Sequence, residues 1–301
     1  MDDAITFVVP AYNCADMIGA TIQSIVETNL QPQDEIIIVD DGSTDDTPNV
    51  IADLRAQHPA IVALKHNFNK GSAAASRNTA IDASSNALIF CLDADNLLAP
   101  NSIKLLKNHL IANGADAAAF GELQFFTTDA AVITHKWVFR EQITFADALA
   151  GSQWPGPSGN YLFTRESWKQ AGRYHEHIGG AIDSWAFGIR QLATGSQMVT
   201  LPNTHYLHRH GYESTFIRES RGNNASLRAL QVLLPYIDQI EDEDIEYMLS
   251  KENRLTWFSD LSTRPIRIKA QAAGKSGELV QGANGSKVRR VLQAVKRRVW
   301  S

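Results

Sequence analysis

The sequence predicts an α/β protein in which a mainly parallel sheet is sandwiched by helices. Over the first third of the chain, short continuous apolar runs alternate with helical patterns. Continuous apolar runs are typical of parallel strands that are buried on both faces. The 301 residues, 44% of them hydrophobic and 20% charged, can build a core of that size. Polar clusters directly follow three of the runs, at Tyr12-Asn13, at 40–43 and at 93–96.

The individual elements follow from periodicity and from turn residues. Strands are predicted at 5–12, 35–43, 61–67 and 87–92. Helices are predicted from Met17 to Val26, from Pro48 to Leu54, after a loop within 69–84, and over 102–114. After about residue 116 the alternation loosens, with an irregular loop at 151–160 and a short helix at 165–172. From about residue 223 the pattern becomes helical and more polar.

Charge and composition exclude several classes of protein. The net charge is −5, and without the six basic residues of 286–301 the rest of the chain carries −11, which argues against a general nucleic-acid binder. Only two cysteines, Cys14 and Cys91, are present, so no disulfide framework is expected. The acidic start does not resemble a signal peptide, and no apolar run is long enough to span a bilayer. We therefore expect a cytoplasmic protein.

The segment 286–301 has a character of its own. Its valines and Leu292 fall on one helical face and its lysines and arginines on the other. This pattern predicts a helix that lies on an anionic membrane surface, at the inner face of the cell membrane. The alternative is a terminal helix that packs on the body of the protein.

Asp93 and Asp95 directly follow the predicted strand at 87–92. Two carboxylates this close repel each other unless a cation or a partner lies between them. Oxygen ligands of this kind suit Mn²⁺ or Mg²⁺, which share their coordination with phosphate oxygens and water. The alternative is a turn whose acidic residues cap the helix that starts near Asn101.

Four motifs occur in a fixed order: VVPAYN (8–13), IIIVDDGSTDDT (36–47), NKGSAAASRNTAI (69–81) and FCLDADN (90–96). In this order and spacing they resemble the family 2 glycosyltransferases, inverting enzymes with the Rossmann-like GT-A fold. The resemblance implies a metal-dependent enzyme that moves a sugar from a nucleotide-diphosphate sugar, with UDP as the favoured nucleotide, to a hydroxyl group. A glycan or a lipid-linked acceptor is implied, in the assembly of surface polysaccharide.

The resemblance also implies roles for residues of the first three motifs. Pro10, Tyr12 and Asp41 would hold the base and ribose of the donor. Lys70 and Arg77 would line the loop beside its diphosphate. Two roles are open for Arg77: it contacts the diphosphate, or it braces Asp93 and Asp95. A tight Asp-Gly turn would explain residues 40–43 without any ligand.

The remaining implied ligands hold the metal. Asp95 would be the principal ligand of Mn²⁺ or Mg²⁺, and Asp93 would contact the metal or the ribose. Many relatives have a third Asp where this chain has Asn96. In the segment THYLHRHGYES, His210 is our first choice for a histidine that reaches the metal, and His208 the second. A zinc site is the rival interpretation, but it would need further ligands and no Cys lies nearby.

For the catalytic base, the resemblance implies Asp183 in GGAIDSWAFGIR, which would take the proton of the acceptor hydroxyl. Many relatives have Glu where this chain has Ile182. An ordinary helix N-cap is the structural alternative for Asp183. Trp185 could offer its ring to a sugar or could be a core residue.

The implied division of the chain is a GT-A domain at 1–222 and a helical extension with a basic tail at 223–301. Within the domain, 1–115 would bind the nucleotide sugar and 116–222 would face the acceptor. Two other functions stay open: a sugar-nucleotide nucleotidyltransferase, and an inactive nucleotide-sugar-binding scaffold. The extension could also support a homo-oligomer.

Overall fold

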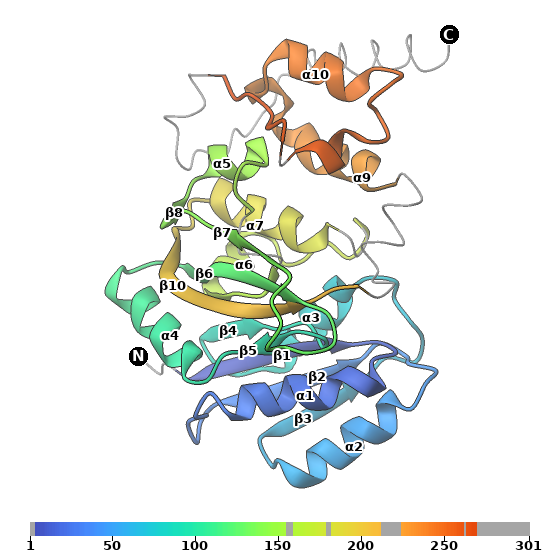
Figure 1. Ribbon diagram of the computed structural model, residues 1–301, viewed down its shortest axis with the longest axis vertical. Coiled ribbons are helices and arrows are strands. Elements are labelled where there is room, and N and C mark those ends of the chain that lie inside the picture. Colours follow the sequence, from blue (N-terminus) through green and yellow to red (C-terminus); the bar gives the residue numbers. More distant parts are fainter. Residues whose placement is uncertain (1–3, 155–158, 179–181, 212–223, 262, 270–301) are drawn as a thin grey trace.

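A computed structural model describes residues 4–154, 159–178, 182–211, 224–261 and 263–269. Its centre is one mixed sheet with the strand order β3-β2-β1-β4-β9-β6-β10-β5, while β7 pairs with β6 and β8 with β10 (Figure 1). Helices lie on both faces of this sheet. The predicted α/β class is therefore confirmed.

The first half of the sheet is parallel, as predicted. β1 (Ile5–Ala11) lies between β2 (Glu35–Asp40) and β4 (Leu88–Cys91), and β3 (Ile61–Lys65) pairs with β2. The connecting helices are α1 (Ala15–Val26), α2 (Thr47–Gln57) and α3 (Ala73–Ala83). Each of these strands ends one to three residues before the predicted limit.

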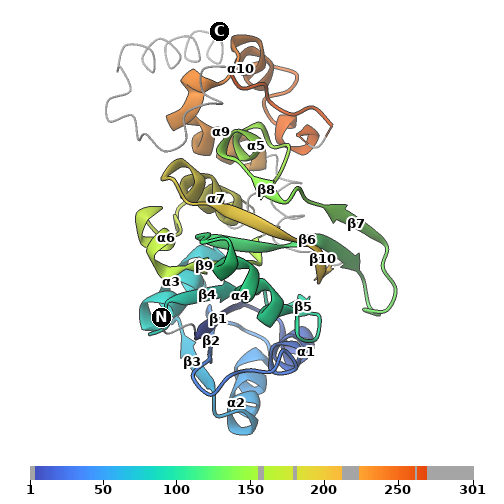
Figure 2. The same cartoon turned by 90° about the vertical axis from the view of Figure 1, so that its left-hand side faces the viewer.

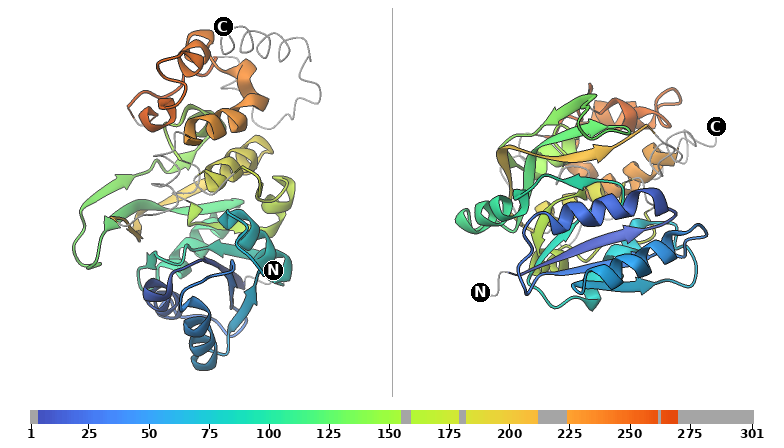
Figure 3. Two further views of the ribbon diagram at one scale, coloured as in Figure 1. Left: turned by 90° about the vertical axis from the view of Figure 1, so that its right-hand side faces the viewer. Right: turned by 60° about the horizontal axis from the view of Figure 1, so that its bottom comes forward.

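The second half mixes directions. It comprises β5 (Leu97–Leu98), α4 (Ser102–Ala112), β6 (Ala117–Phe126), β7 (His135–Val138), β8 (Gln142–Ile143), α5 (Phe145–Ala150), β9 (Leu162–Thr164), α6 (Arg165–Gln170), α7 (Asp183–Ala193) and β10 (Met198–Arg209). β9 runs antiparallel between β4 and β6, whereas β6 and β10 are parallel. The hairpin of β6 and β7 projects from the side of the molecule (Figures 2 and 3).

Alternate residues of the central strands belong to two hydrophobic cores, one on each face of the sheet. Phe7 and Val9 of β1 belong to a core shared with α1, α2 and α4. Val8, between them, belongs to a core shared with α3, α6 and α7. This alternation explains why the strand is apolar without interruption, since both of its faces are covered.

The C-terminal extension joins the second of these cores. It contains α9 (Asn224–Leu233), η2 (Leu234–Gln239), α10 (Asp242–Leu249) and η3 (Trp257–Asp260). Phe258 contacts the ring of Trp185 in α7, and the Ile266 N–H donates to the Ala150 carbonyl in α5. The extension therefore packs against α5 and α7. The boundary at residue 222 stays a prediction.

The predicted amphipathic tail, 286–301, lies outside the described residues. Among the helices of the described ranges, none combines the length and the apolar character that crossing a membrane requires.

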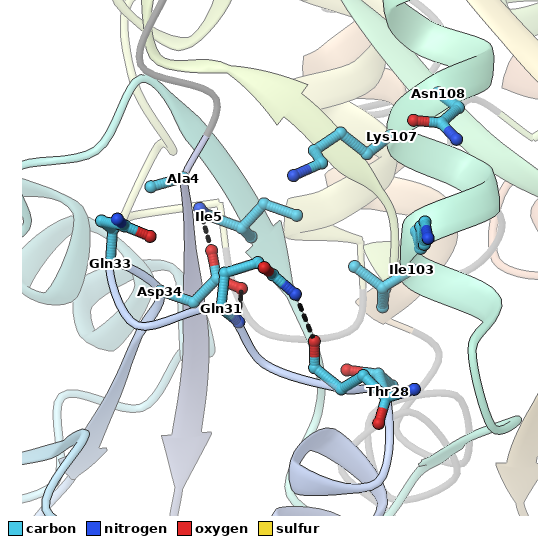
Figure 4. Close-up of a pocket in the computed structure, with 11 residues that line it drawn as sticks. Ala4, Ile5, Thr28, Gln31, Gln33, Asp34, Ile103, Lys107 and Asn108 are labelled. Carbon is cyan, nitrogen blue, oxygen red and sulfur yellow. Dashed lines mark hydrogen bonds between the residues drawn. The ribbon is translucent and has the colours of Figure 1, made fainter.

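A polar cavity of about 530 Å³ lies where β1 and β2 begin (Figure 4). Asp34 closes one wall, where it accepts hydrogen bonds from the Ile5 and Gln31 N–H groups, both at 2.8 Å. Lys107 of α4 lines the other side. No predicted site residue lines this cavity, which lies at the opposite end of the strands from the polar clusters.

Candidate active site

The polar clusters after β1 and β2 are tied together at the carboxyl edge of the sheet. The Asn13 side-chain oxygen accepts a hydrogen bond from the Thr44 N–H at 2.8 Å, and the Ser43 hydroxyl accepts one from the Asn13 N–H at 3.0 Å. The Asp41 N–H reaches back to the Ala11 carbonyl at 2.8 Å. These bonds hold the clusters after β1 and β2 together at the edge where ligands of open α/β sheets bind.

Asp41 is buried and held by two neighbours. One carboxylate oxygen forms a hydrogen bond with His66 Nδ1 at 2.6 Å, and the other accepts from the Lys70 N–H at 3.0 Å. His66 Nε2 in turn contacts the Thr79 hydroxyl at 3.0 Å. Asp41 is therefore fixed in direction, which suits a group that recognises a base edge. Sequence reasoning missed His66, since a single histidine after a strand carries no distinct signal.

Tyr12 and Lys70 border the same edge from the solvent side. The Tyr12 ring is exposed, whereas Pro10 is half-buried. The Lys70 ammonium lies 4.1 Å from the centre of the Phe68 ring. Their predicted contacts with a nucleotide stay predictions.

Arg77 of α3 joins the two carboxylates that matter most to the predicted chemistry. One guanidinium nitrogen donates to Asp93 at 2.6 Å and another to Asp183 at 2.9 Å. The arginine side chain is only 3% exposed. Burial opposes its charge, but the two carboxylates prevail and raise the pKa of Arg77 well above its usual value. The bond to Asp93 is one of the two contacts that the bracing role supposes for Arg77, and a role of Arg77 at the diphosphate stays a prediction.

Asn160 clamps Asp93 from the other side. Its side-chain oxygen accepts the Asp93 N–H at 2.7 Å, and its amide nitrogen donates to the Asp93 carboxylate at 3.1 Å. The residue is fully buried. From the sequence, Asn160 is expected only in an irregular loop, although a Gly-Asn pair shortly before a strand is a signal that a special turn occurs there.

Gly159 explains that turn. Its φ is +85°, and a Cβ atom at this position would overlap the Ser184 hydroxyl and lie 2.5 Å from the Ser184 Cβ. Ser184 itself donates its backbone N–H to Asp183 at 2.7 Å. The absence of a side chain therefore lets the Asn160 loop approach the start of α7.

We expect Gly159→Ala to destabilise the protein more than Gly172→Ala. Gly172 has a similar φ of +75°, but no atom lies within 4 Å of the place that a methyl group would take, so its change costs only the backbone strain of roughly 1–2 kcal/mol. Overpacking against Ser184 adds about 1–3 kcal/mol to that strain. Urea unfolding of both variants measures the difference. Equal losses of stability would contradict the close approach.

Asp183 is the first residue of α7 and is 3% exposed. Burial raises the pKa of Asp183, and the charge of Arg77 opposes this rise. A raised pKa makes a carboxylate a better proton acceptor near neutral pH. If Asp183 were the N-cap residue, α7 would begin at Ser184. The helix instead begins at Asp183, and Ile182 occupies the N-cap position. The role of Asp183 as a base stays a prediction.

Asp95 lies near a second carboxylate, that of Asp93. Burial, and then the charge of Asp93, raise the pKa of Asp95 to about 7. A divalent cation would offset the cost of charging both groups, so the site fits a metal ion. Asn96 is fully buried and accepts the Arg209 N–H at 3.0 Å. This bond ties the Asp-x-Asp turn to the end of β10.

The two candidate histidines have different surroundings. Burial lowers the pKa of His208 to about 4, although the nearby Asp93 carboxylate favours the charged imidazole. Its Nδ1 atom is buried and meets no hydrogen-bond partner within the described part of the chain. His210 instead forms a hydrogen bond through Nε2 with the Thr134 hydroxyl at 2.8 Å and contacts His135. His208 is therefore the better placed of the two toward the carboxylates.

The described residues do not by themselves complete a metal site. In the described ranges, no three His, Cys, Asp or Glu side chains form a group that could hold an ion. The donor set suits a metal that completes its shell with phosphate oxygens and water.

Trp185 lies in the core. It is buried and contacts the rings of Trp154 and Phe258 at 6.1 and 5.2 Å between centres. Its ring contacts other aromatic side chains, as the core alternative for this residue supposed. Contact with a sugar stays a prediction.

The comparisons with known proteins agree with this geometry. The family model described as Glycosyl transferase family 2 matches residues 6–167, which is more than half of the chain. The chain belongs to glycosyl transferase family 2. The matched range contains all four motifs together with Asn160, whereas Asp183 lies beyond it.

Relatives of this family 2 chain cover parts of it. A chondroitin synthase from Escherichia coli is 27% identical over 183 residues, which are 60% of this chain and 25% of the relative. The glucosyltransferase WfaP from Escherichia coli, whose name gives a UDP-Glc donor and a diphosphoundecaprenol acceptor, is 38% identical over 93 residues, 31% of this chain and 36% of the relative. The chain therefore spans well under two thirds of the length of these curated relatives.

Solved structures show the same fold. Residues 1–349 of TarS from S. aureus superpose with a TM-score of 0.58 at 15% identity, covering 76% of this chain and 65% of that one. A complex of the same TarS fragment with UDP-GlcNAc gives a TM-score of 0.59 at 14% identity, covering 76% and 66%. This family 2 chain thus has the GT-A fold, as the motifs implied.

Proposed function

We propose that this protein is a metal-dependent inverting glycosyltransferase that moves a sugar from a UDP-sugar to a hydroxyl of a glycan or lipid-linked acceptor. The observation that carries the proposal is the junction at Arg77. One buried guanidinium holds Asp93 of the metal motif and Asp183, the candidate base, in a single site. Asp93 in turn acts on the charge of Asp95, so donor and acceptor chemistry would share one pocket.

The chain's own residues divide the work. Asp41, fixed by His66, accepts the imide hydrogen of uracil, while the exposed Tyr12 ring stacks on the base. Asp183 takes the proton of the acceptor hydroxyl as it attacks the anomeric carbon from the face opposite the leaving diphosphate. Arg77 and Asn160 keep Asp93 in place throughout.

The metal would be Mn²⁺ or Mg²⁺, with Asp95 and Asp93 as ligands and with phosphate oxygens and water completing its shell. Because no three His, Cys, Asp or Glu side chains of the described residues already form an ion site, His208 would approach the metal only once the nucleotide is bound. When bound, the metal neutralises the diphosphate and stabilises the charge that develops as this group leaves. His208 replaces His210 as our first choice, because its Nδ1 is buried and meets no partner among the described residues, whereas His210 already bonds Thr134.

Several relatives support the setting of surface polysaccharide assembly. WfaP is named for a lipid-diphosphate acceptor, and a relative from Rhizobium meliloti is named as a succinoglycan biosynthesis protein. We extend this setting to the present chain. A peripheral position at the membrane through 286–301, and a homo-oligomer, remain part of the proposal. The two rival functions are an inactive scaffold and a nucleotidyltransferase.

Nucleotide binding tests the proposal through thermal unfolding. We expect UDP with Mn²⁺ to raise the melting temperature, since a ligand at a hundredfold excess over its dissociation constant adds about 2.7 kcal/mol. UDP without metal should give a smaller shift. Asp95→Ala and His208→Ala should weaken the metal-dependent part, whereas His210→Ala should keep it, because His210 faces the hairpin.

GDP, dTDP and CMP serve as controls for the base. If one of these three nucleotides gives a larger thermal shift than UDP, that nucleotide takes the place of UDP in the proposed donor. The absence of any nucleotide shift would favour the scaffold. Equal losses in His208→Ala and His210→Ala would remove the distinction between the two histidines.

A further inference from the structure

The projecting hairpin of β6 and β7 exposes a group of apolar side chains. We call residues 130–138 the hairpin arm; their sequence is AAVITHKWV. Val132 and Ile133, at its turn, are 60% and 38% exposed, and Trp137 and Val138, in β7, are 43% and 62% exposed. A single exposed apolar side chain is ordinary on a protein surface, but several in one short segment indicate a contact with another molecule.

The exposed side chains of the hairpin arm point to both sides of the hairpin. Every residue of β7 is exposed, and Trp137 and Val138 are consecutive in the strand, so they face opposite ways. The hairpin projects from the side of the molecule (Figures 2 and 3). A groove on a partner protein would cover one of the two faces, whereas lipids surround a projecting segment and cover both. The shape therefore favours a membrane surface.

The charges of this segment suit the same partner. Residues 130–140 contain no Asp or Glu, and the two cations, Lys136 and Arg140, follow the apolar turn and are 55% and 63% exposed. Each has an acidic partner, but such exposed pairs are weak, so both cations can reach lipid headgroups. The acid nearest the turn, Asp129, accepts the Ala131 N–H at 2.9 Å. Trp and basic residues beside an apolar tip are typical of segments that enter the interface of a bilayer.

The root of the hairpin is joined to the candidate active site. Arg209, at the end of β10, donates to the Thr127 carbonyl at 3.0 Å and to the Asp95 carbonyl at 3.2 Å. β6 and β10 are parallel, so both end at the edge of the sheet that carries the Asp-x-Asp turn, and the hairpin begins there. Contact of the hairpin arm with a membrane would therefore bring this edge close to the bilayer surface, where a lipid-linked acceptor lies.

We propose that the hairpin arm is a membrane-contact site, which places Val132 and Ile133 among the lipids at the surface of a phospholipid bilayer, with Lys136 and Arg140 at the headgroups. The inference goes beyond the proposed function, in which the membrane contact is made by 286–301. It adds a second contact, on the GT-A fold itself, and it orients the edge with the Asp-x-Asp turn toward the bilayer.

A fluorescent label on the hairpin arm of the full chain tests this contact. Both native cysteines are buried, so a maleimide of the dye NBD reacts selectively with the thiol introduced by Ile133→Cys. We expect vesicles of phosphatidylcholine and phosphatidylglycerol to raise the NBD emission several-fold and to shift it to shorter wavelength. Lipids brominated on their acyl chains should quench it. Leu105→Cys is the matched control, since Leu105 is 53% exposed on α4, and its label should not respond.

A second substitution measures what the apolar turn contributes. Val132→Asp, added to the labelled variant, should weaken vesicle binding about tenfold or more, because a charged group replaces a side chain that enters the lipids. Val132 is 60% exposed, so the change does not disturb a core. Val62→Asp is its control, since Val62 is another exposed valine, at 42%, on β3, and vesicle binding should stay unchanged.

The label reports its own position, so several results would overturn the proposal. If vesicles capture the protein while the emission from position 133 stays unchanged, the tail or another surface makes the contact. If that emission rises with protein concentration in the absence of vesicles, the hairpin arm contacts a second copy of the chain. Equal vesicle binding with and without Val132→Asp would also contradict it. The measurement omits UDP and Mn²⁺, so its failure leaves the nucleotide test of the proposed function unaffected.

Discussion

Replacing Arg77 with Met should lower the free energy of unfolding by about 3–5 kcal/mol, because the change leaves the buried Asp183 carboxylate and the half-buried Asp93 carboxylate without their shared partner. Asp93 and Asp183 both depend on this guanidinium, at 2.6 and 2.9 Å. Urea unfolding of wild type and variant measures the loss.

Arg140→Met is the matched control. Arg140 pairs with Asp147 at 2.7 Å, but its side chain is 63% exposed, and exposed pairs contribute only about 0–1 kcal/mol. Adding Asp183→Asn to Arg77→Met should recover part of the lost stability, since it removes the buried carboxylate charge that Arg77 no longer compensates. Equal effects of the two arginine changes would show that the Arg77 junction contributes no more than a surface pair.

If Asp183 is the base, as we propose, replacing it with Asn should lower the rate of sugar transfer by about 10²–10⁴-fold, because the amide cannot accept the acceptor proton. UDP binding in the presence of Mn²⁺ should survive, since the proposed base acts on the acceptor and not on the nucleotide. Transfer kinetics and the UDP-dependent thermal shift, measured on the same preparation, separate the two properties.

Ser184→Ala gives the comparison for Asp183→Asn. It removes the hydroxyl that donates to Asp183 at 3.2 Å but keeps the backbone bond and the carboxylate. The loss of one such bond lowers transfer by less than about tenfold. If Asp183→Asn instead loses UDP affinity and keeps its turnover, Asp183 is a donor-site residue and another group is the base.

The parallel half of the sheet could be predicted because its signals are local. Uninterrupted apolar runs, helical spacing and polar turns each lie within a few residues, so β1 to β4 and α1 to α4 follow from the sequence alone. The antiparallel insertion of β9 between β4 and β6 could not be predicted in this way. Its three residues carry no periodicity, and their place depends on contacts with strands that are distant in the sequence.

The residues of the candidate site likewise differ in how far local sequence signals predict them. Asp41, Arg77, Asp93 and Asp95 stand in ordered motifs and could be named from the sequence. Asn160 and His66 could not, because each acts through a partner that is distant in the sequence. The choice between His208 and His210 likewise depends on the contacts that each side chain makes with other strands. These contacts depend on the pairing register of β6, β7 and β10, which the sequence alone does not give.

The Arg77 junction limits how enzymes of this kind could be recombined. Residues 1–115 supply Arg77 and Asp93, while 116–222 supply their partners Asp183 and Asn160. A chimera joined near residue 115 would therefore take the two sides of the Arg77–Asp183 ion pair and of the Asn160 clamp from different parents. Such a hybrid would fold well only where both parents hold these four side chains in the same geometry. Exchanging residues 1–115 alone would thus disturb residues 116–222 through both the Arg77–Asp183 ion pair and the Asn160 clamp.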